Sequence, residues 1–134
     1  EGLLLSPGTD VSIIATGHLV WEALEAAIML REKGISAEVI DIHTIKPIDE
    51  KIVIESAKKT GAVVSCEEHN FLGGLGESIS RTLATHHPTP QELTSAAEQS
   101  NATWLQEGHG DCSGWPQAQQ QGLFAAGTVA LRWG

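Results

Sequence analysis

The residues of this chain best suited to chemistry are the consecutive Glu67, Glu68 and His69. Two carboxylates beside an imidazole could supply a general acid and a general base. Consecutive side chains of an extended segment point in alternate directions, so the three do not converge easily on one point. We therefore assign no catalytic residue here. The favoured interpretation is that these side chains tie neighbouring loops or a second subunit together.

A glycine cluster follows, with Gly73, Gly74 and Gly76 preceding an amphipathic segment. Backbone N–H groups at the start of a helix can hold a phosphate. The spacing, however, is neither the dinucleotide-binding fingerprint nor the phosphate-binding loop of nucleotide hydrolases. Close packing of a helix against a strand is the favoured explanation, and these glycines join the preceding residues as candidate loop or interface positions.

A weaker candidate is an anion site at Gly17 and His18, where a helix is expected to begin. The alternative is that Gly17 only permits a turn. HExxH, paired CxxC and GxSxG motifs are absent, so the sequence predicts neither a metal site nor a serine hydrolase. Cys66 and Cys112 are too few for a disulfide scaffold and are expected to be free thiols.

Three successive β-then-α units are predicted to position these candidates. Runs of β-branched and apolar residues predict strands at 11–15, 37–42 and 62–66. Apolar residues one helical turn apart predict helices at 19–33, 50–60 and 75–84. The first helix is expected to keep Glu22 outside its apolar stripe. The units together predict an α/β fold, a three-layer α/β/α arrangement with a mostly parallel sheet.

The composition changes after this region. No lysine follows Lys59 and no isoleucine follows Ile79, while Gln, Ala and Gly become frequent. We divide the chain into an α/β core at 1–90 and a divergent C-terminal segment of the same domain at 91–134. One hypothesis for this segment is a shifted reading frame.

The overall charge restricts the class of partner. The 134 residues carry a formal net charge of −9, which argues against nucleic acid and anionic membrane surfaces. No apolar stretch approaches the length of a membrane span. We expect a cytoplasmic protein. Because the chain begins at Glu1 and contains a single methionine, we also expect a piece of a longer polypeptide.

Three segments resemble the C-terminal domain of transketolase in their order and spacing. They are Asp10–Gly17, with its Ala-Thr-Gly end, Ala37–Asp49, with Asp-Ile-His-Thr-Ile-Lys-Pro, and Glu67–Gly76, with Glu-Glu-His-Asn-Phe-Leu-Gly-Gly-Leu-Gly. The resemblance covers about residues 8–88. It implies the C-terminal domain of a transferase of carbohydrate metabolism, in the pentose phosphate pathway, that moves two-carbon ketol units between sugar phosphates.

The same resemblance implies cofactors and partners. Transketolases use thiamine diphosphate with Mg²⁺ or Ca²⁺. Their N-terminal domain holds the diphosphate and the metal, and their middle domain supplies the glutamate that activates the cofactor. The family's diphosphate motif, a Gly-Asp-Gly with a later Asn, is absent here. The resemblance thus implies no catalytic or cofactor-binding residue in this segment and no cofactor bound by this domain alone. The implied partners are those other domains, in the same enzyme or a partner subunit, and a second copy in a homodimer. The implied role is packing, dimerisation or regulation.

Two alternatives stay open. One is the equivalent domain of a 2-oxo acid dehydrogenase E1 β subunit or of deoxyxylulose-phosphate synthase. The three segments resemble these two enzymes less closely than they resemble transketolase. The other is a stand-alone α/β docking or ligand-binding module, in which Gly17 and the 73–76 glycines would provide anion sites.

Overall fold

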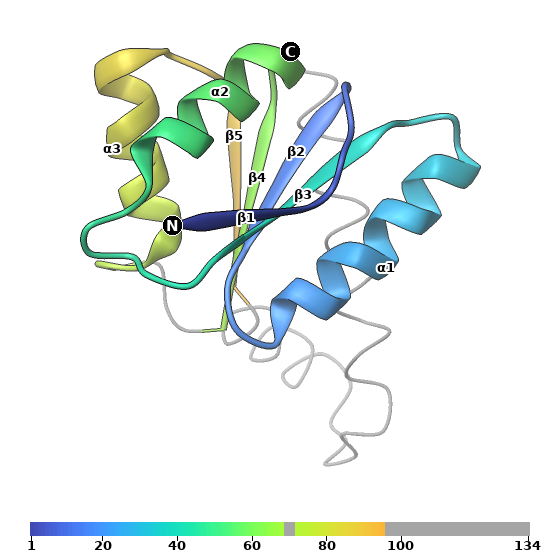
Figure 1. The fold of residues 1–134 in the computed structure, drawn as a ribbon, viewed down its shortest axis with the longest axis horizontal. Coiled ribbons are helices and arrows are strands. Elements are labelled where there is room, and N and C mark those ends of the chain that lie inside the picture. Colours follow the sequence, from blue (N-terminus) through green and yellow to red (C-terminus); the bar gives the residue numbers. More distant parts are fainter. Residues whose placement is uncertain (69–71, 96–134) are drawn as a thin grey trace, which may run out of the picture.

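The computed structural model describes residues 1–68 and 72–95. Their strands form one sheet of order β1-β3-β2-β4-β5 (Figure 1). The strands are β1 (Gly2–Ser6), β2 (Val11–Ala15), β3 (Ala37–Ile42), β4 (Val63–Glu67) and β5 (Gln91–Ser95). The helices are α1 (Leu19–Glu32), α2 (Glu50–Thr60) and α3 (Leu75–His86). The predicted α/β fold with a mostly parallel sheet is confirmed.

The sheet is parallel except at one edge. β2, β3, β4 and β5 run in the same direction, whereas β1 pairs antiparallel with β3. The central strands β2 and β4 are buried along their whole length. Burial along a whole strand is typical of parallel strands that are covered on both faces.

Helices cover the two faces of the sheet, with α1 on one and α2 and α3 on the other (Figure 1). Under α1 the core contains Ile13 and Val39, and under α2 and α3 it contains Ile14 and Ile40. Alternate residues of each strand therefore supply the two cores. All four side chains are at most 1% exposed, and each such burial stabilises the fold by about 1.5–3 kcal/mol.

Asp49 fixes the start of α2 as its N-cap residue. Its Oδ1 accepts a hydrogen bond from the Ile52 N–H at 3.3 Å, and its Oδ2 accepts one from the Gly2 N–H at 3.0 Å. The second bond ties β1 to α2. The Gly2 bond is also the main cause that lowers the pKa of Asp49.

A polar network joins the sheet to α2 near the amino ends of β2 and β3. Glu38 is 1% exposed, and its Oε1 accepts a hydrogen bond from Ser56 Oγ at 2.6 Å. Its other carboxylate oxygen pairs with Lys59. Ser12 Oγ lies 2.6 Å from Ser56 Oγ. A buried carboxylate needs such partners because its desolvation is costly.

The structure corrects one prediction on α1. Glu22 is buried, with 8% of its surface exposed, rather than lying outside the apolar stripe. It follows Leu19 by three positions and precedes Ala26 by four, so it falls on the same helical face as these two buried residues.

Candidate functional site

The candidate residues lie where the parallel strands end. Gly17 and His18 follow β2, His43 follows β3, and Glu67 and Glu68 lie at the end of β4. β2 and β4 are neighbours in the sheet, but the helices that follow them, α1 and α3, cover opposite faces. In open α/β sheets the crevice outside such a pair of strand ends is the usual place for a ligand.

Glu67 points toward the start of α3 and is 3% exposed. Its Oε2 accepts a hydrogen bond from the backbone N–H of Gly76, in the first turn of α3, at 2.7 Å. The N-cap residue Gly74 has no side chain with which to make such a bond. A carboxylate also suits the positive end of a helix. Glu67 therefore supplies from β4 the cap that α3 lacks at its own N-cap.

The glycines leave room for this arrangement. A Cβ at Gly74 would lie 2.0 Å from Glu67 Oε1, and a Cβ at Gly76 would lie 2.7 Å from Leu93 Cδ2. Gly73 has a φ of +71° and donates its N–H to Glu77 Oε2 at 2.8 Å. These contacts support the packing explanation of the glycine cluster, since a carboxylate already lies at the helix end where a phosphate would bind.

Glu68 lies beside a different loop. One of its carboxylate oxygens is 3.5 Å from the position that a Cβ on Gly17 would occupy. Glu67 contacts α3 instead, so the structure does not bring the two carboxylates to one point, which agrees with the alternation of extended side chains. His69 lies outside the described residues.

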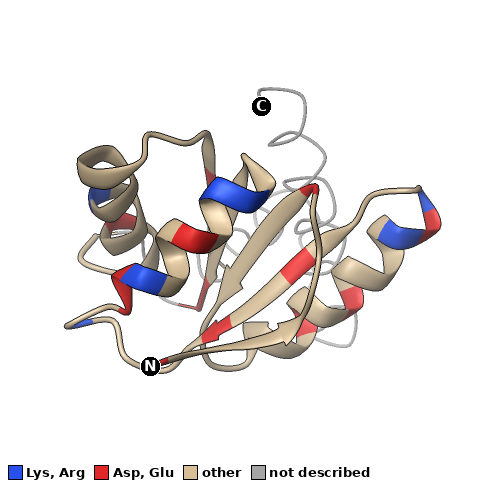
Figure 2. Cartoon of the chain, turned by 45° about the horizontal axis from the view of Figure 1, so that its top comes forward, with Lys and Arg blue, Asp and Glu red and all other residues tan. Residues whose placement is uncertain are grey.

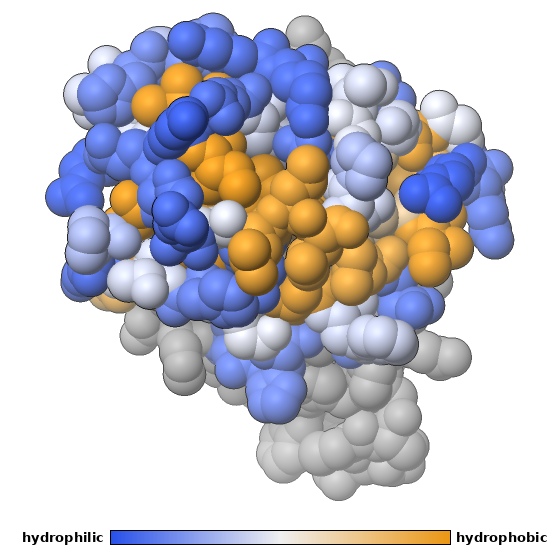
Figure 3. Space-filling model, in the orientation of Figure 1, coloured by the Kyte–Doolittle hydropathy of each residue, from blue (hydrophilic) through white to orange (hydrophobic). Residues whose placement is uncertain are grey.

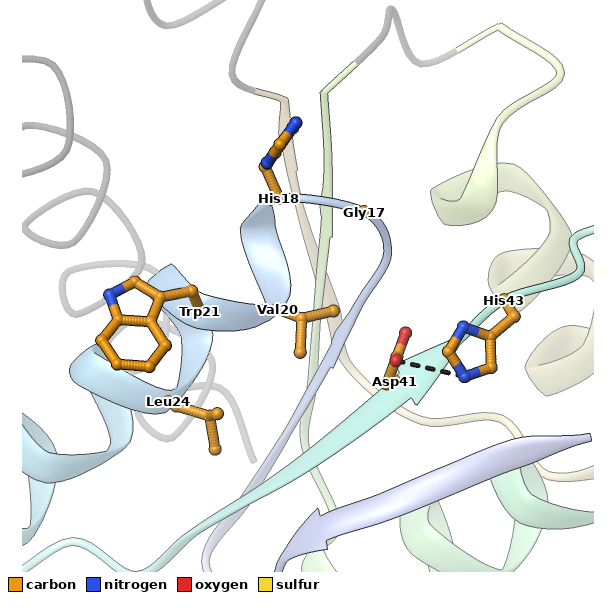
Figure 4. Close-up of a pocket in the computed structure, with 7 residues that line it drawn as sticks. All are labelled: Gly17, His18, Val20, Trp21, Leu24, Asp41 and His43. Atoms are coloured by element: carbon orange, nitrogen blue, oxygen red, sulfur yellow. Dashed lines mark ion pairs between the residues drawn. The ribbon is translucent and has the colours of Figure 1, made fainter.

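Gly17 and His18 border a pocket between α1 and the end of β3 (Figure 4). Its volume is about 460 Å³. Val20, Trp21 and Leu24 of α1 form one wall, and Asp41 and His43 form the opposite edge. Asp41 Oδ2 lies 3.3 Å from His43 Nε2. The candidate residues did not include this pair, although its place at the end of a predicted strand was a usable signal.

Basic side chains lie away from this pocket. Figure 2 shows Lys and Arg mainly on α2, on α3 and at the far end of α1, while β3 carries acidic residues. Lys46, the first lysine after β3, lies near the α3 side, with its Nζ 3.8 Å from where a Cβ on Gly73 would be. Within residues 1–68 and 72–95, no Lys or Arg lines the pocket.

Cys66 of β4 is a buried free thiol. Burial raises its pKa to about 12, with a smaller contribution from the neighbouring Glu67 charge. A thiol that stays protonated is a poor nucleophile and a poor metal ligand. Within residues 1–68 and 72–95, no three His, Cys, Asp or Glu side chains are placed to hold a metal ion. None of the described helices is both long and apolar enough to cross a membrane.

Comparisons with known proteins agree on one family. The family profile described as "Transketolase, C-terminal domain" matches residues 1–102. The chain is 51% identical over 87 residues to a 6-deoxy-6-sulfo-D-fructose transketolase subunit of Clostridium, and the match covers 65% of this chain and 27% of that protein. It is 44% identical over 89 residues to an apulose-4-phosphate transketolase subunit of Phocaeicola vulgatus, and that match covers 66% of this chain and 28% of that protein.

A solved structure is similar over almost the whole chain. It is described as a split-gene transketolase, an inactive beta4 tetramer, and it matches with a TM-score of 0.83 and 36% identity over 98% of this chain and 41% of that one. The chain spans about a quarter of the length of the two curated relatives. The profile match, the identities and the shared fold together show that this chain belongs to the transketolase C-terminal domain family, within the thiamine diphosphate-dependent enzymes.

Proposed function

We propose that this chain is the C-terminal part of a transketolase-type transferase that moves two-carbon ketol units between sugar phosphates. Its role is supporting: it packs beside the cofactor-binding parts and contributes to a dimer. The observation that carries this proposal is the use of Glu67. The residue best placed for acid–base chemistry caps α3 through Gly76 instead, within a domain whose relatives are named as transketolase subunits.

The residues at the strand ends do not fit thiamine diphosphate or its metal ion. Glu67 lies at the start of α3 and Glu68 lies beside Gly17, so negative charge is present where a diphosphate would need backbone N–H groups. The described residues also lack a set of metal ligands. We therefore propose that N-terminal and middle domains hold the cofactor and the Mg²⁺ or Ca²⁺ ion, in the same enzyme or in a partner subunit.

A separate partner subunit is the arrangement that the comparisons favour. Both curated relatives are named as subunits, and the similar solved structure is described as coming from a split gene. We propose that this chain, or the longer protein that contains it, joins a cofactor-binding subunit in the cytoplasm. We further propose that a second copy completes the dimer, with Glu68, His69 and Gly73 in the loops nearest to the interface.

Calorimetry and an activity assay test this division of labour. Thiamine diphosphate with Mg²⁺, titrated into the 134-residue chain, is expected to give no binding heat. Ketol transfer from a ketose phosphate to an aldose phosphate is expected only after the cofactor-binding part is added. Micromolar binding by this chain alone would contradict the proposal.

A further inference from the structure

The pocket between α1 and β3 has features that the proposed function does not use. Figure 4 shows the Asp41 carboxylate at one edge, facing the wall formed by Val20 and Leu24. The Asp41 side chain is only 14% exposed, and His43, which is 57% exposed, lies beside it. A carboxylate that is largely removed from water but borders an open pocket can gain strongly from a positively charged hydrogen-bond donor.

The charges around the pocket favour a cation over an anion. Of the described residues, Asp41 lines the pocket together with His18 and His43, and no lysine or arginine does. Glu68 adds a second carboxylate next to Gly17, which also lines the pocket. The chain as a whole carries a formal charge of −9, so its field also attracts cations.

The pocket walls suit an apolar stem as well as a charged head. Trp21, at the outer wall, is 65% exposed. Leu3 of β1 is directly paired with Asp41 in the sheet and is 50% exposed, and directly paired residues lie on the same face. Figure 3 shows a continuous apolar patch on the side of the molecule where β1 lies. Figure 4 shows the Trp21 indole on the far side of Val20 and Leu24 from Asp41, so it offers apolar surface to a stem and not a contact to a cation held by Asp41.

We propose that this pocket binds a guanidinium or primary ammonium group carried on an apolar stem. The cation contacts the Asp41 carboxylate, and its stem packs against Val20, Leu24 and the Trp21 indole. The same chemistry is offered by an arginine or lysine side chain of another protein and by a free organic cation. The site is separate from the Glu67–Gly76 contact and does not depend on ketol-transfer activity.

An NMR titration of the ¹⁵N-labelled whole chain tests the proposal with three probes. They are agmatine, the peptide acetyl-Leu-Arg-Leu-amide and the same peptide with neutral citrulline in place of arginine. The arginine peptide is expected to shift the Trp21 indole signal with a dissociation constant on the order of 1 mM. If the arginine peptide binds at least about tenfold more tightly than agmatine, the ligand is a side chain of another protein. If the two bind equally, the ligand is a free organic cation.

Three variants locate the binding. Asp41→Asn is expected to weaken binding of the arginine peptide by about tenfold or more, because a charged hydrogen bond is lost. Trp21→Ala is expected to weaken it by about threefold, because the stem loses apolar contact. Ile28→Ala is the matched control, because Ile28 is another exposed apolar residue of α1, at 49%, and does not line the pocket. Equal affinity for the citrulline peptide, or full binding by a folded Asp41→Asn variant, would overturn the proposal. If Asp41→Asn does not fold, the citrulline peptide and Trp21→Ala decide the question.

Discussion

The carboxylate of Glu67 accepts a hydrogen bond from the backbone N–H of Gly76 at 2.7 Å, across the junction between β4 and α3. This contact joins the paired glutamates at the end of β4 to the glycine cluster that follows them. Both features therefore have a common structural explanation, the attachment of α3 to the sheet.

Removal of this cap is expected to destabilise the domain. Glu67→Ala leaves the first turn of α3 without its acceptor, and we expect a loss of about 1–3 kcal/mol in the free energy of unfolding. Glu67→Gln keeps an acceptor oxygen and should lose less. Urea denaturation followed by circular dichroism measures both changes. Glu68→Ala is the control, since Glu68 is only half-buried, and an equal loss in that variant would contradict the capping role.

Gly76 is expected to tolerate no side chain while Leu93 is present. Gly76→Ala places a methyl group 2.7 Å from Leu93 Cδ2, and such overpacking costs about 1–3 kcal/mol. The double variant with Leu93→Ala should lose less than the sum of the single variants, because the clash is relieved. Gly34→Ala, where no atom lies within 4 Å of the added Cβ, should show no such coupling to Leu93. Additive losses for Gly76→Ala and Leu93→Ala would exclude the proposed clash.

The Glu38 network should be sensitive to loss of a single partner. Lys59→Met removes the positive partner of a carboxylate that is 1% exposed. We expect a loss of about 2–4 kcal/mol, because an uncompensated charge then remains in the interior. The double variant Glu38→Met/Lys59→Met should recover part of this stability. Thermal unfolding measures the melting temperatures of the single and the double variant. Equal melting temperatures for these two variants would show that the carboxylate does not need Lys59.

Asp49 should make the stability depend on pH in the acid range. Its pKa in the folded protein is below the ordinary value of 3.8, chiefly because of the Gly2 N–H bond. The stability that it contributes is therefore present at neutral pH and is lost as the pH falls below 3.8 toward the folded value. The difference in urea midpoint between the wild type and Asp49→Asn should shrink as the pH is lowered from neutral to about 3. A constant difference would show that the charge of Asp49 does not contribute.

Cys66 should resist thiol reagents in the folded protein. Its pKa is about 12 against an ordinary value of 9.0, so the thiolate is scarce below pH 9. Between these two values the unfolded thiol ionises while the folded one does not, so rising pH should favour unfolding. In a Cys112→Ser background, the rate of Cys66 modification by iodoacetamide at about pH 8 should equal the rate for an exposed thiol multiplied by the equilibrium fraction of unfolded protein. Rapid modification without unfolding would contradict its burial.

Much of the fold could be predicted because the three β-then-α units are encoded locally. Asp49 and Gly61 mark the ends of α2 in the sequence, and the structure has Asp49 as the N-cap and Gly61 as the C-cap, with a φ of +77°. The edge strand β1 was not predicted. It is five residues long, and its position depends on antiparallel pairing with β3, which is distant in the sequence.

Long-range contacts also explain the other differences. β5 has the polar sequence Gln-Glu-Leu-Thr-Ser, and it pairs with β4 while the Gln91 amide donates to Gly76 O and Ser65 Oγ. Nothing in its local pattern indicates that environment. The pocket at Asp41 arises only because α1 packs beside β3, so its wall and its charge come from separate segments.

The hydrogen bond between Glu67 and Gly76 attaches α3 to the sheet, so its role is structural and does not depend on a particular reaction. In this chain the attachment of α3 depends on an acceptor at Glu67 and on the space at Gly74 and Gly76. If the proposed function is correct, we expect these residues to be the same whichever sugar the assembled enzyme transforms. Under the same proposal, we expect substrate specificity to reside in the chains or domains with which this one assembles.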